Sequence, residues 1–214
     1  MAILTKGLLS PTGISGRIGN LVYVTYRGKQ CVRALPKKRS GKPTKPQLIQ
    51  RERFRLVTQR LCGFTPLFNI GFQHPRGRMA AYNYAVSYAY KHALTGKFPD
   101  FRLDFSKMLF TCGPLAPAYQ PKAENMGYES IRFSWQYKNW FPDKANDRAV
   151  LIAVCEEPLL FFFTHAQVPR ISEIGFLHTP GMAGKKLHTY IGFTDAFGKK
   201  AADSVYTGEL TLAP

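Results

Sequence analysis

The chain has 214 residues, of which 45% are hydrophobic and 14% aromatic, so it can bury a sizeable core and global disorder is excluded. Its formal net charge of +17 indicates an anionic partner. The longest apolar run, residues 149–155, is far shorter than the ~18 residues that span a bilayer, and the N-terminal residues lack the basic segment of a signal peptide. The sequence therefore predicts a cytoplasmic protein with no membrane partner.

The surplus of positive charge lies almost entirely in the first part of the chain. Up to Lys122 there are 21 Lys and Arg residues against three Asp and Glu residues, whereas from Ala123 onwards there are nine against ten. A charge separation of this kind is typical of a basic part that meets a polyanion and a neutral part with another role. The sequence thus predicts two domains, a basic hairpin, arm and helical domain over 1–122 and a second domain over 123–214.

Residues 13–36 are predicted to form a β-hairpin. Glycines punctuate residues 13–19, β-branched and aromatic residues dominate 21–26, and Arg27-Gly28-Lys29 would turn the chain back. Spaced glycines can cradle phosphate through backbone N–H groups, but no Gly-Lys-Ser/Thr follows, which excludes a P-loop. Turns in a small sheet are the simpler interpretation of these glycines.

An extended basic arm follows over residues 36–46. Its prolines and glycine oppose regular structure, it has no acidic residue, and it carries five cations: Lys37, Lys38, Arg39, Lys42 and Lys45. Such arms often follow phosphates or enter a minor groove. A solvated loop that aids solubility is the alternative interpretation.

A helix is predicted over 44–62, because Thr44 can cap it, Pro46 suits its first turn and Gln47 completes a capping box. At about 100° per residue, its apolar stripe comprises Phe54, Val57 and Leu61. This stripe is expected to pack in the core.

The arginines of this helix divide between two environments. Arg51 and Arg55 fall on the solvent face with Glu52 nearby, and they join the arm as predicted phosphate contacts. Arg53 and Arg60 lie between apolar groups, so each is expected to snorkel, to pair with a carboxylate or to meet an anion. Because the arginines form no single stripe, a packed helix with snorkelling arginines is the alternative to a helix that binds nucleic acid.

A second helix is predicted over 78–94. Tyr84 and Tyr88 fall together on one of its sides, near Lys91 and His92. An exposed pair of tyrosines beside cations suits base stacking or a protein interface. Packing of this side on the N-terminal hairpin is the alternative.

From about residue 123 the sequence becomes a series of six or seven short strands, which is typical of a β-sandwich. Trp135 closes an early strand, and residues 189–193 precede the turn Asp195-Ala196-Phe197-Gly198. In these features the last 90 or so residues resemble a fibronectin type III-like domain. The resemblance implies a module that binds or spaces. The predicted fold class is therefore α+β, with an N-terminal basic β-hairpin plus helices followed by a C-terminal all-β sandwich.

The whole chain also resembles an uncharacterised protein family, a domain of unknown function that is frequent in Bacteroidetes. The resemblance lies in residues 15–20, 32–36 and 204–206, and in Pro43-Thr44 with Gln47, Gln50 and Arg51. It supports the order of the parts and implies no catalytic residues.

No catalytic residue, metal site or cofactor is predicted. The cysteines and histidines are scattered without metal-ligand spacing, and Glu156 and Glu157 are adjacent at a turn and are expected to point apart. We therefore expect a non-enzymatic binding protein that contacts nucleic acid through phosphates with little sequence preference, with the sandwich as a partner-binding or spacer module. The predicted polyanion contacts are Lys37, Lys38, Arg39, Lys42, Lys45, Arg51 and Arg55, with Tyr84 and Tyr88 as stacking candidates.

The alternative function is that of a structural or assembly component, such as a phage-like or other particle subunit. In that case the basic arm would dock on an acidic protein surface, and the glycine-rich hairpin would suit strand exchange between subunits. Homo-oligomers are expected under this hypothesis, whereas DNA and RNA are both candidate partners under the first.

Overall fold

The computed structural model of the protein describes residues 3–4, 14–26, 29–37, 41–72, 79–127, 129–138 and 145–213. The chain forms two compact units, Met1–Thr44 and Lys45–Pro214, which we call the N-terminal unit and the C-terminal unit. The division lies at the start of the first helix, instead of at residue 122 where the charge distribution changes.

The N-terminal unit is a four-stranded antiparallel sheet in the order β1-β2-β3-β4. Its strands are β1 (Ile3–Leu4), β2 (Ile14–Ile18), β3 (Leu21–Tyr26) and β4 (Lys29–Ala34). Gly19 and Asn20 form the two-residue turn between β2 and β3, and the φ of 57° at Gly19 is one that glycine adopts without strain. The sheet is larger than the single hairpin that the sequence predicts, because β2 pairs with β3 on the side away from β4.

The C-terminal unit begins with helices α1 (Lys45–Leu61), α2 (Thr65–Gly71) and α3 (Ala81–His92), and the 3-10 turn η1 (Cys62–Phe64) joins the first two. The hairpin of β5 (Leu94–Lys97) and β6 (Asp100–Leu103) and the 3-10 turn η2 (Phe105–Lys107) follow. The helix predicted over 44–62 agrees with α1 to within one residue at each end. The second predicted helix is shorter in the structure, since α3 occupies only twelve residues.

Seven strands then form two antiparallel sheets that pack as a sandwich. One sheet has four strands in the order β10-β9-β12-β13 and the other has three in the order β11-β8-β7. In chain order the strands are β7 (Tyr119–Asn125), β8 (Ser130–Gln136), β9 (Arg148–Cys155), β10 (Leu160–Pro169), β11 (Ile174–His178), β12 (Lys186–Thr194) and β13 (Val205–Thr211), with the 3-10 turn η4 (Arg170–Ser172) before β11. The prediction of six or seven short strands in this part of the chain is confirmed.

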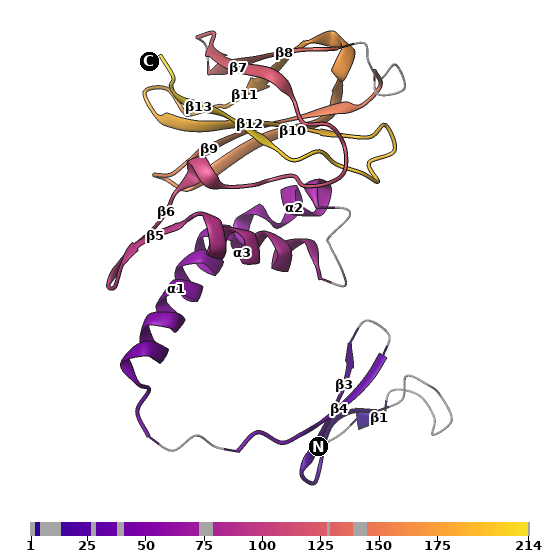
Figure 1. Ribbon diagram of the computed structural model, residues 1–214, viewed down its shortest axis with the longest axis vertical. Helices are drawn as coiled ribbons and strands as arrows, with labels where there is room; N and C mark the ends of the chain where they lie inside the picture. Colours follow the sequence, from indigo (N-terminus) through magenta and orange to yellow (C-terminus); the bar gives the residue numbers. More distant parts are fainter. Residues whose placement is uncertain are drawn as a thin grey trace. The chain divides into compact units, whose positions relative to one another are not determined.

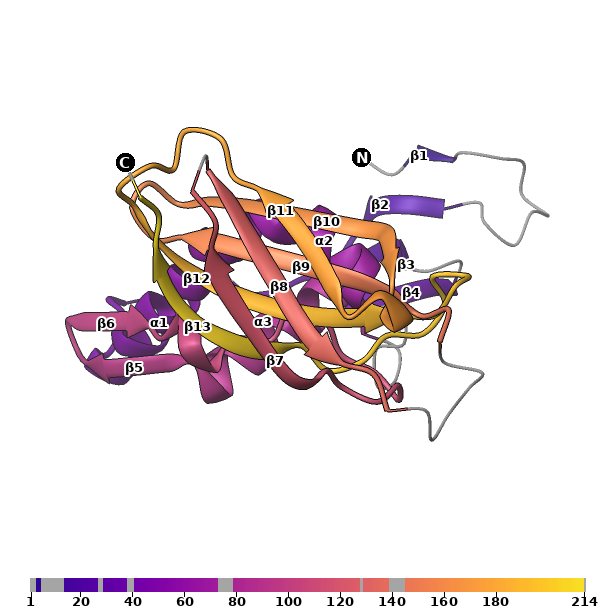
Figure 2. The same ribbon diagram turned by 90° about the horizontal axis from the view of Figure 1, so that it is seen from above.

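Strand β9 explains how the helices and the sandwich form one unit. Successive side chains of a strand point to opposite faces. Val150, Ile152 and Val154 pack in a core with the helices, whereas Leu151 and Ala153 pack against the three-stranded sheet. Figure 1 shows the resulting layers, with α2 and α3 on one face of the four-stranded sheet and β7, β8 and β11 on the other, and Figure 2 shows the sheets from above.

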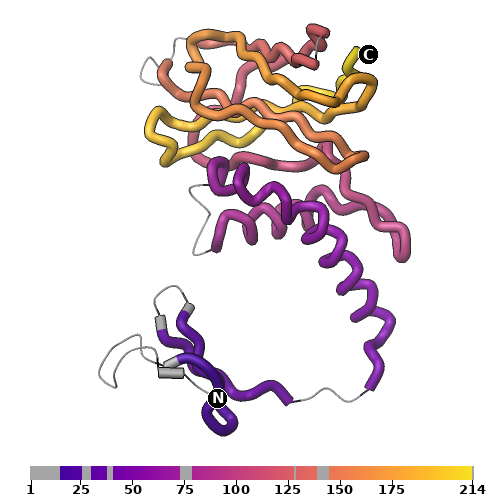
Figure 3. Tube along the Cα trace, turned by 180° about the vertical axis from the view of Figure 1, so that it is seen from behind, coloured from indigo at the N-terminus to yellow at the C-terminus, as the bar shows by residue number. Residues whose placement is uncertain are grey.

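This arrangement corrects the predicted domain boundary at residue 122. The aromatic side chains of Phe64, Phe68 and Phe110 are at most 1% exposed and belong to the same core as Tyr190 of β12. Cutting the chain at residue 122 would expose this core, because its two halves come from opposite sides of the cut. Figure 3, which views the molecule from behind, shows α2 and α3 directly beneath the sheets, while α1 extends away from them.

One end of the sandwich is closed by a buried ion pair between Arg170 and Asp147, whose Nη2 and Oδ2 atoms are 3.2 Å apart. Arg170 also donates hydrogen bonds to the carbonyl oxygens of Ala116 and Pro117, and its guanidinium lies 3.8 Å from the ring centre of Phe193. Burial lowers the pKa of this guanidinium, and the neighbouring Asp147 carboxylate counteracts part of that effect. Arg170 therefore joins the turn after β10 to two other segments, through Asp147 to the residues before β9 and through its hydrogen bonds to the residues before β7.

Candidate nucleic-acid interface

The cations of the predicted arm divide between the two units. Lys37 and Lys42 are exposed in the N-terminal unit, and Lys45 is exposed at the start of α1. Lys38 and Arg39 lie outside the described residues. The exposure of Lys37, Lys42 and Lys45 is what a phosphate contact requires, and for Lys38 and Arg39 the contact stays a prediction from the sequence.

The charged residues of the N-terminal unit are all basic. It contains no Asp or Glu, and nine of its residues are cationic: Lys6, Arg17, Arg27, Lys29, Arg33, Lys37, Lys38, Arg39 and Lys42. Directly opposite residues of an antiparallel pair point to the same face. Arg17 pairs with Val22 and Val22 pairs with Arg33, so the sheet places these two arginines on one face. Sequence reasoning missed them, although the alternation along 21–26 and 29–34 could have revealed that face.

The other face of this sheet is apolar and open. Ile18, Leu21 and Val32 are 50%, 42% and 52% exposed, and the register places them on the face that also carries Tyr23 and Ala34. Among the described side chains of the N-terminal unit, none is buried. A small sheet usually needs a packed hydrophobic face to be stable, so this face is suited to contact with another surface.

Arg51 and Arg55 are both exposed on α1, as predicted. Arg55 pairs with Glu52 one turn earlier on the helix, with Nε donating to Oε2 at 3.1 Å. Hydrogen bonding from Arg55 lowers the pKa of the Glu52 carboxyl, so this pair is charged at neutral pH. Arg51 has the greater potential as a phosphate contact, because the charge of Arg55 is partly neutralised.

The two arginines that the sequence places near the core have different surroundings. The guanidinium of Arg53 lies 5.0 Å from the ring centre of Tyr90 and 5.7 Å from that of Phe101, which are cation–π distances. Arg60 lines a cavity of about 590 Å³ together with Arg102 and the carboxylates of Asp104, Glu156 and Glu157. Neither position presents an isolated cation to a polyanion.

The predicted stacking residues Tyr84 and Tyr88 pack against the core, which corrects their assignment. The ring centre of Tyr84 lies 5.4 Å from that of Phe72, and its hydroxyl lies 3.9 Å from Cys112 Sγ. Tyr88 is half-buried, and burial raises the pKa of its hydroxyl. This side of α3 packs against the same core as β9, so both rings are partly covered and do not form an exposed stacking pair.

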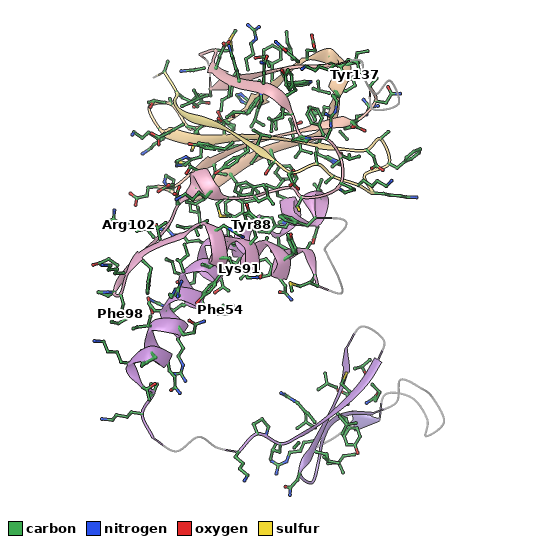
Figure 4. The ribbon with its side chains drawn as sticks, in the orientation of Figure 1. Phe54, Tyr88, Lys91, Phe98, Arg102 and Tyr137 are labelled. Carbon is green, nitrogen blue, oxygen red and sulfur yellow. The ribbon has the colours of Figure 1, made fainter. Side chains whose placement is uncertain are left out.

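Helices α1 and α3 instead form a groove of about 470 Å³ on another side. From α1 it receives Gln50, Phe54 and Thr58, and its remaining lining residues are Met79, Tyr82, Asn83, Val86, Ser87, Tyr90 and Lys91. Phe54 is 56% exposed, although the apolar stripe predicts it in the core with Val57 and Leu61, both of which are fully buried. Figure 4 shows Phe54 on α1 and Lys91 on α3.

A chain of polar side chains lies on the other side of the C-terminal unit. His188 Nε2 lies 3.0 Å from Glu156 Oε1, and His188 Nδ1 lies 3.0 Å from the hydroxyl of Tyr206. The same histidine stacks on Phe105, with ring centres 5.5 Å apart. These contacts hold the ring of His188, which is on β12, against β13 and the turn after β9, and they make it a structural link between these segments.

Among the described residues, no helix is long and apolar enough to cross a bilayer. Within the same residues, no group of three or more His, Cys, Asp or Glu side chains is close enough to hold a metal ion.

The chain is similar to fibronectin type III domains of known structure. One is the fn3 domain of the human collagen alpha-1(XX) chain, with 14% identity and a TM-score of 0.36 over 46% of this chain and 85% of that chain. Another is in the FN1–FN3 domains of chicken CNTN1, with 9% identity and a TM-score of 0.35 over 48% of this chain and 33% of that chain. No curated protein matches the chain.

The family relationship covers nearly the whole sequence. The model of one protein family, described as a family of unknown function, matches residues 13–208, which include the N-terminal sheet from its second strand, the helices and the sandwich. The frequency of relatives in Bacteroidetes stays a prediction from the sequence motifs. The chain therefore belongs to the family of unknown function DUF6266.

Proposed function

We propose that the protein is a non-enzymatic, cytoplasmic binding protein whose basic N-terminal hairpin and arm contact nucleic acid through its phosphates, with little sequence preference. The observation that carries this proposal is the composition of the N-terminal unit, in which nine residues are cationic and none is acidic. A surface of this kind attracts any polyanion at low salt, and a duplex or single strand offers regularly spaced phosphates.

The first helix adds candidate phosphate contacts on the C-terminal unit. Lys45 and Arg51 are exposed, and the only acidic residue of α1 already pairs with Arg55. The sandwich would then serve as a partner-binding or spacer module, since its surplus charge is close to zero. Such a division of labour needs no base-specific contact, because phosphate contacts position a protein without reading sequence.

Replacing Lys37, Lys38, Arg39 and Lys42 together with serine is expected to weaken nucleic-acid binding while the fold is retained. With four fewer phosphate contacts, binding releases fewer counterions from the nucleic acid. The magnitude of the slope of log K against log salt should therefore fall by about 3–4, and the affinity at ~0.1 M salt should fall tenfold or more. Fluorescence anisotropy with a labelled duplex across a salt series measures both quantities.

The matched control replaces four exposed lysines of the C-terminal unit, Lys122, Lys185, Lys199 and Lys200, with serine. It removes the same charge from the chain. The proposal holds if the control binds nearly as well as the wild type while the arm variant does not. Equal losses in both variants would show that net charge alone attracts the duplex and would remove the specific role of the arm.

A second candidate function, that of an assembly component, is supported by the exposed apolar face of the N-terminal sheet. Nucleic acid is a poor cover for Ile18, Leu21 and Val32, whereas an apolar protein surface would bury them. In this case the cations on the opposite face and on the arm would dock on an acidic protein.

The assembly hypothesis predicts oligomers of the nuclease-treated full-length protein that depend on concentration. Sedimentation velocity should show them for the wild type, and replacing Ile18 and Val32 with lysine should abolish them, because two charges on that face oppose its burial. A wild type that stays monomeric at all concentrations without nucleic acid would exclude self-assembly through this face.

A further inference from the structure

We propose that the groove between α1 and α3 is a stacking site for the bases of single-stranded nucleic acid, with Phe54 as its platform. This inference rests on the proposed binding of nucleic acid and adds to it a site on the C-terminal unit and a preference for unpaired strands. It follows from three properties of the groove: an exposed aromatic ring, flanking cations without free carboxylates, and polar groups along the rim.

The aromatic component is Phe54. Its side chain is 56% exposed beside Met79, which is 41% exposed, while Val86 beneath them is buried. A phenylalanine that is more than half exposed leaves aromatic area in contact with water, and a base that stacks on it covers that area. Stacking on aromatic rings tolerates any base, because every base has a π-face.

The groove has the charge that a nucleic-acid backbone requires. Arg51 lies three residues before Phe54, so the two side chains are neighbours on the helix surface, and Lys91 lines the groove from α3. Within α1 and α3 the only acidic residue is Glu52, which pairs with Arg55. The cavity beside Arg60 differs in this respect, because three carboxylates line it and would repel phosphates.

The rim adds groups that can bond to base edges or sugars. Asn83 and Ser87 line the groove, and the hydroxyl of Tyr90 donates a hydrogen bond to Gln50 Oε1 at 2.8 Å. The guanidinium of Arg53 lies over the ring of Tyr90 and holds that wall in place. A volume of about 470 Å³ lies within the range of roughly 300–1,000 Å³ that is typical of ligand pockets.

These features favour a single strand over a duplex. In a duplex the bases stack on one another and their faces are covered, so only the phosphates would meet Arg51 and Lys91. In a single strand a base can turn into the groove while its phosphates stay near the cations. An apolar protein segment is the competing occupant of the groove. Its binding would require an apolar side chain at position 54 of this chain, but not an aromatic one.

The test uses the full-length protein, a labelled oligothymidylate of about 12 nucleotides and a duplex of the same length. Phe54→Ala is expected to weaken binding of the single strand about 5- to 150-fold, the loss that follows from removing one stacked base, while affinity for the duplex stays the same. Phe54→Trp should retain the affinity for the single strand, and Phe54→Leu should lose it, because leucine preserves apolar area without a π-face.

Phe176→Ala is the matched control, since Phe176 is 59% exposed on β11 and lies outside the groove. Its affinity for both probes should equal that of the wild type. Circular dichroism checks that each variant folds, which we expect because Phe54 contributes little buried area.

The outcomes separate this inference from the proposed function. If Phe54→Ala binds the single strand as the wild type does, or if Phe54→Leu retains the affinity, the stacking site is overturned, and an apolar protein segment becomes the better occupant. In that case loss of binding in the arm variant would still support the proposed function. If the wild type binds neither probe at low salt, both the proposed function and the stacking site are overturned.

Discussion

Arg170→Met is expected to destabilise the protein by about 3–5 kcal/mol, because it leaves the buried carboxylate of Asp147 without its ion pair. Both side chains are less than one-tenth exposed, so water cannot replace the lost partner. The variant also loses the hydrogen bonds to Ala116 and Pro117 and the contact with the ring of Phe193. Urea unfolding followed by circular dichroism measures the change as a shift of the midpoint.

The double variant Arg170→Met with Asp147→Leu provides the control for this prediction. The double variant no longer contains the buried carboxylate of Asp147 that loses its ion pair in Arg170→Met, so most of the lost stability should return. A single variant that unfolds at the same urea concentration as the wild type would contradict the structural role of the pair. A double variant as unstable as the single one would instead assign the loss to packing around Phe193.

Local signals in the sequence predict the first helix and the strands of the sandwich, whereas β1, α2 and the β5–β6 hairpin were not predicted. The bounds of α1 follow from Thr44, Pro46 and the glycine after Cys62, all of which act within one turn of the helix ends. The strands of the sandwich follow from short apolar runs separated by turn residues, and the run at 149–155 is β9, whose residues are buried on both faces. These signals depend on residues that are close in sequence.

The domain organisation could not be predicted in this way, because it depends on contacts between distant residues. The change of charge at residue 122 is real, but it does not coincide with a break in packing. Tyr190 shows why: it belongs to the core that the helices share, and its hydroxyl donates to the carbonyl oxygen of Phe105. Charge reports on the surface of a protein, whereas a domain is defined by its core.

The candidate site could be predicted only in part, because the exposure of a side chain also depends on contacts between residues that are distant in sequence. Exposed cations such as Lys37, Lys42 and Arg51 can be identified from sequence, because charged side chains are rarely buried. Helical periodicity groups Phe54 with Val57, and Tyr84 with Tyr88, but it does not say how far each side is covered. The structure shows Phe54 exposed, where a core position was expected, and the two tyrosines partly buried against the core, where exposed stacking rings were one of the two interpretations.

Trp135→Ala is expected to cost about 3–5 kcal/mol of folding stability, the range for a large side chain removed from a core. Trp135 is 3% exposed, its ring meets that of Phe193 at a centre distance of 5.6 Å, and its Nε1 donates to the carbonyl oxygen of Arg170 at 2.7 Å. Trp135 thus packs at the same end of the sandwich as the Arg170–Asp147 pair. Trp135→Ala and Arg170→Met should therefore both destabilise this end of the sandwich. Urea unfolding at neutral pH measures the loss.

Trp135→Phe separates the two contributions of the indole. It keeps most of the apolar area but leaves the carbonyl oxygen of Arg170 without that donor, which should cost about 1–3 kcal/mol. Circular dichroism follows the unfolding of both Trp135 variants, and the emission of Trp135 is measured in a Trp140→Phe variant, where it is the one remaining tryptophan. A short-wavelength emission maximum that moves to longer wavelength on unfolding is expected, and emission typical of exposed tryptophan before unfolding would refute burial. Equal losses for alanine and phenylalanine would show that the hydrogen bond, more than the packing, holds this end of the sandwich closed.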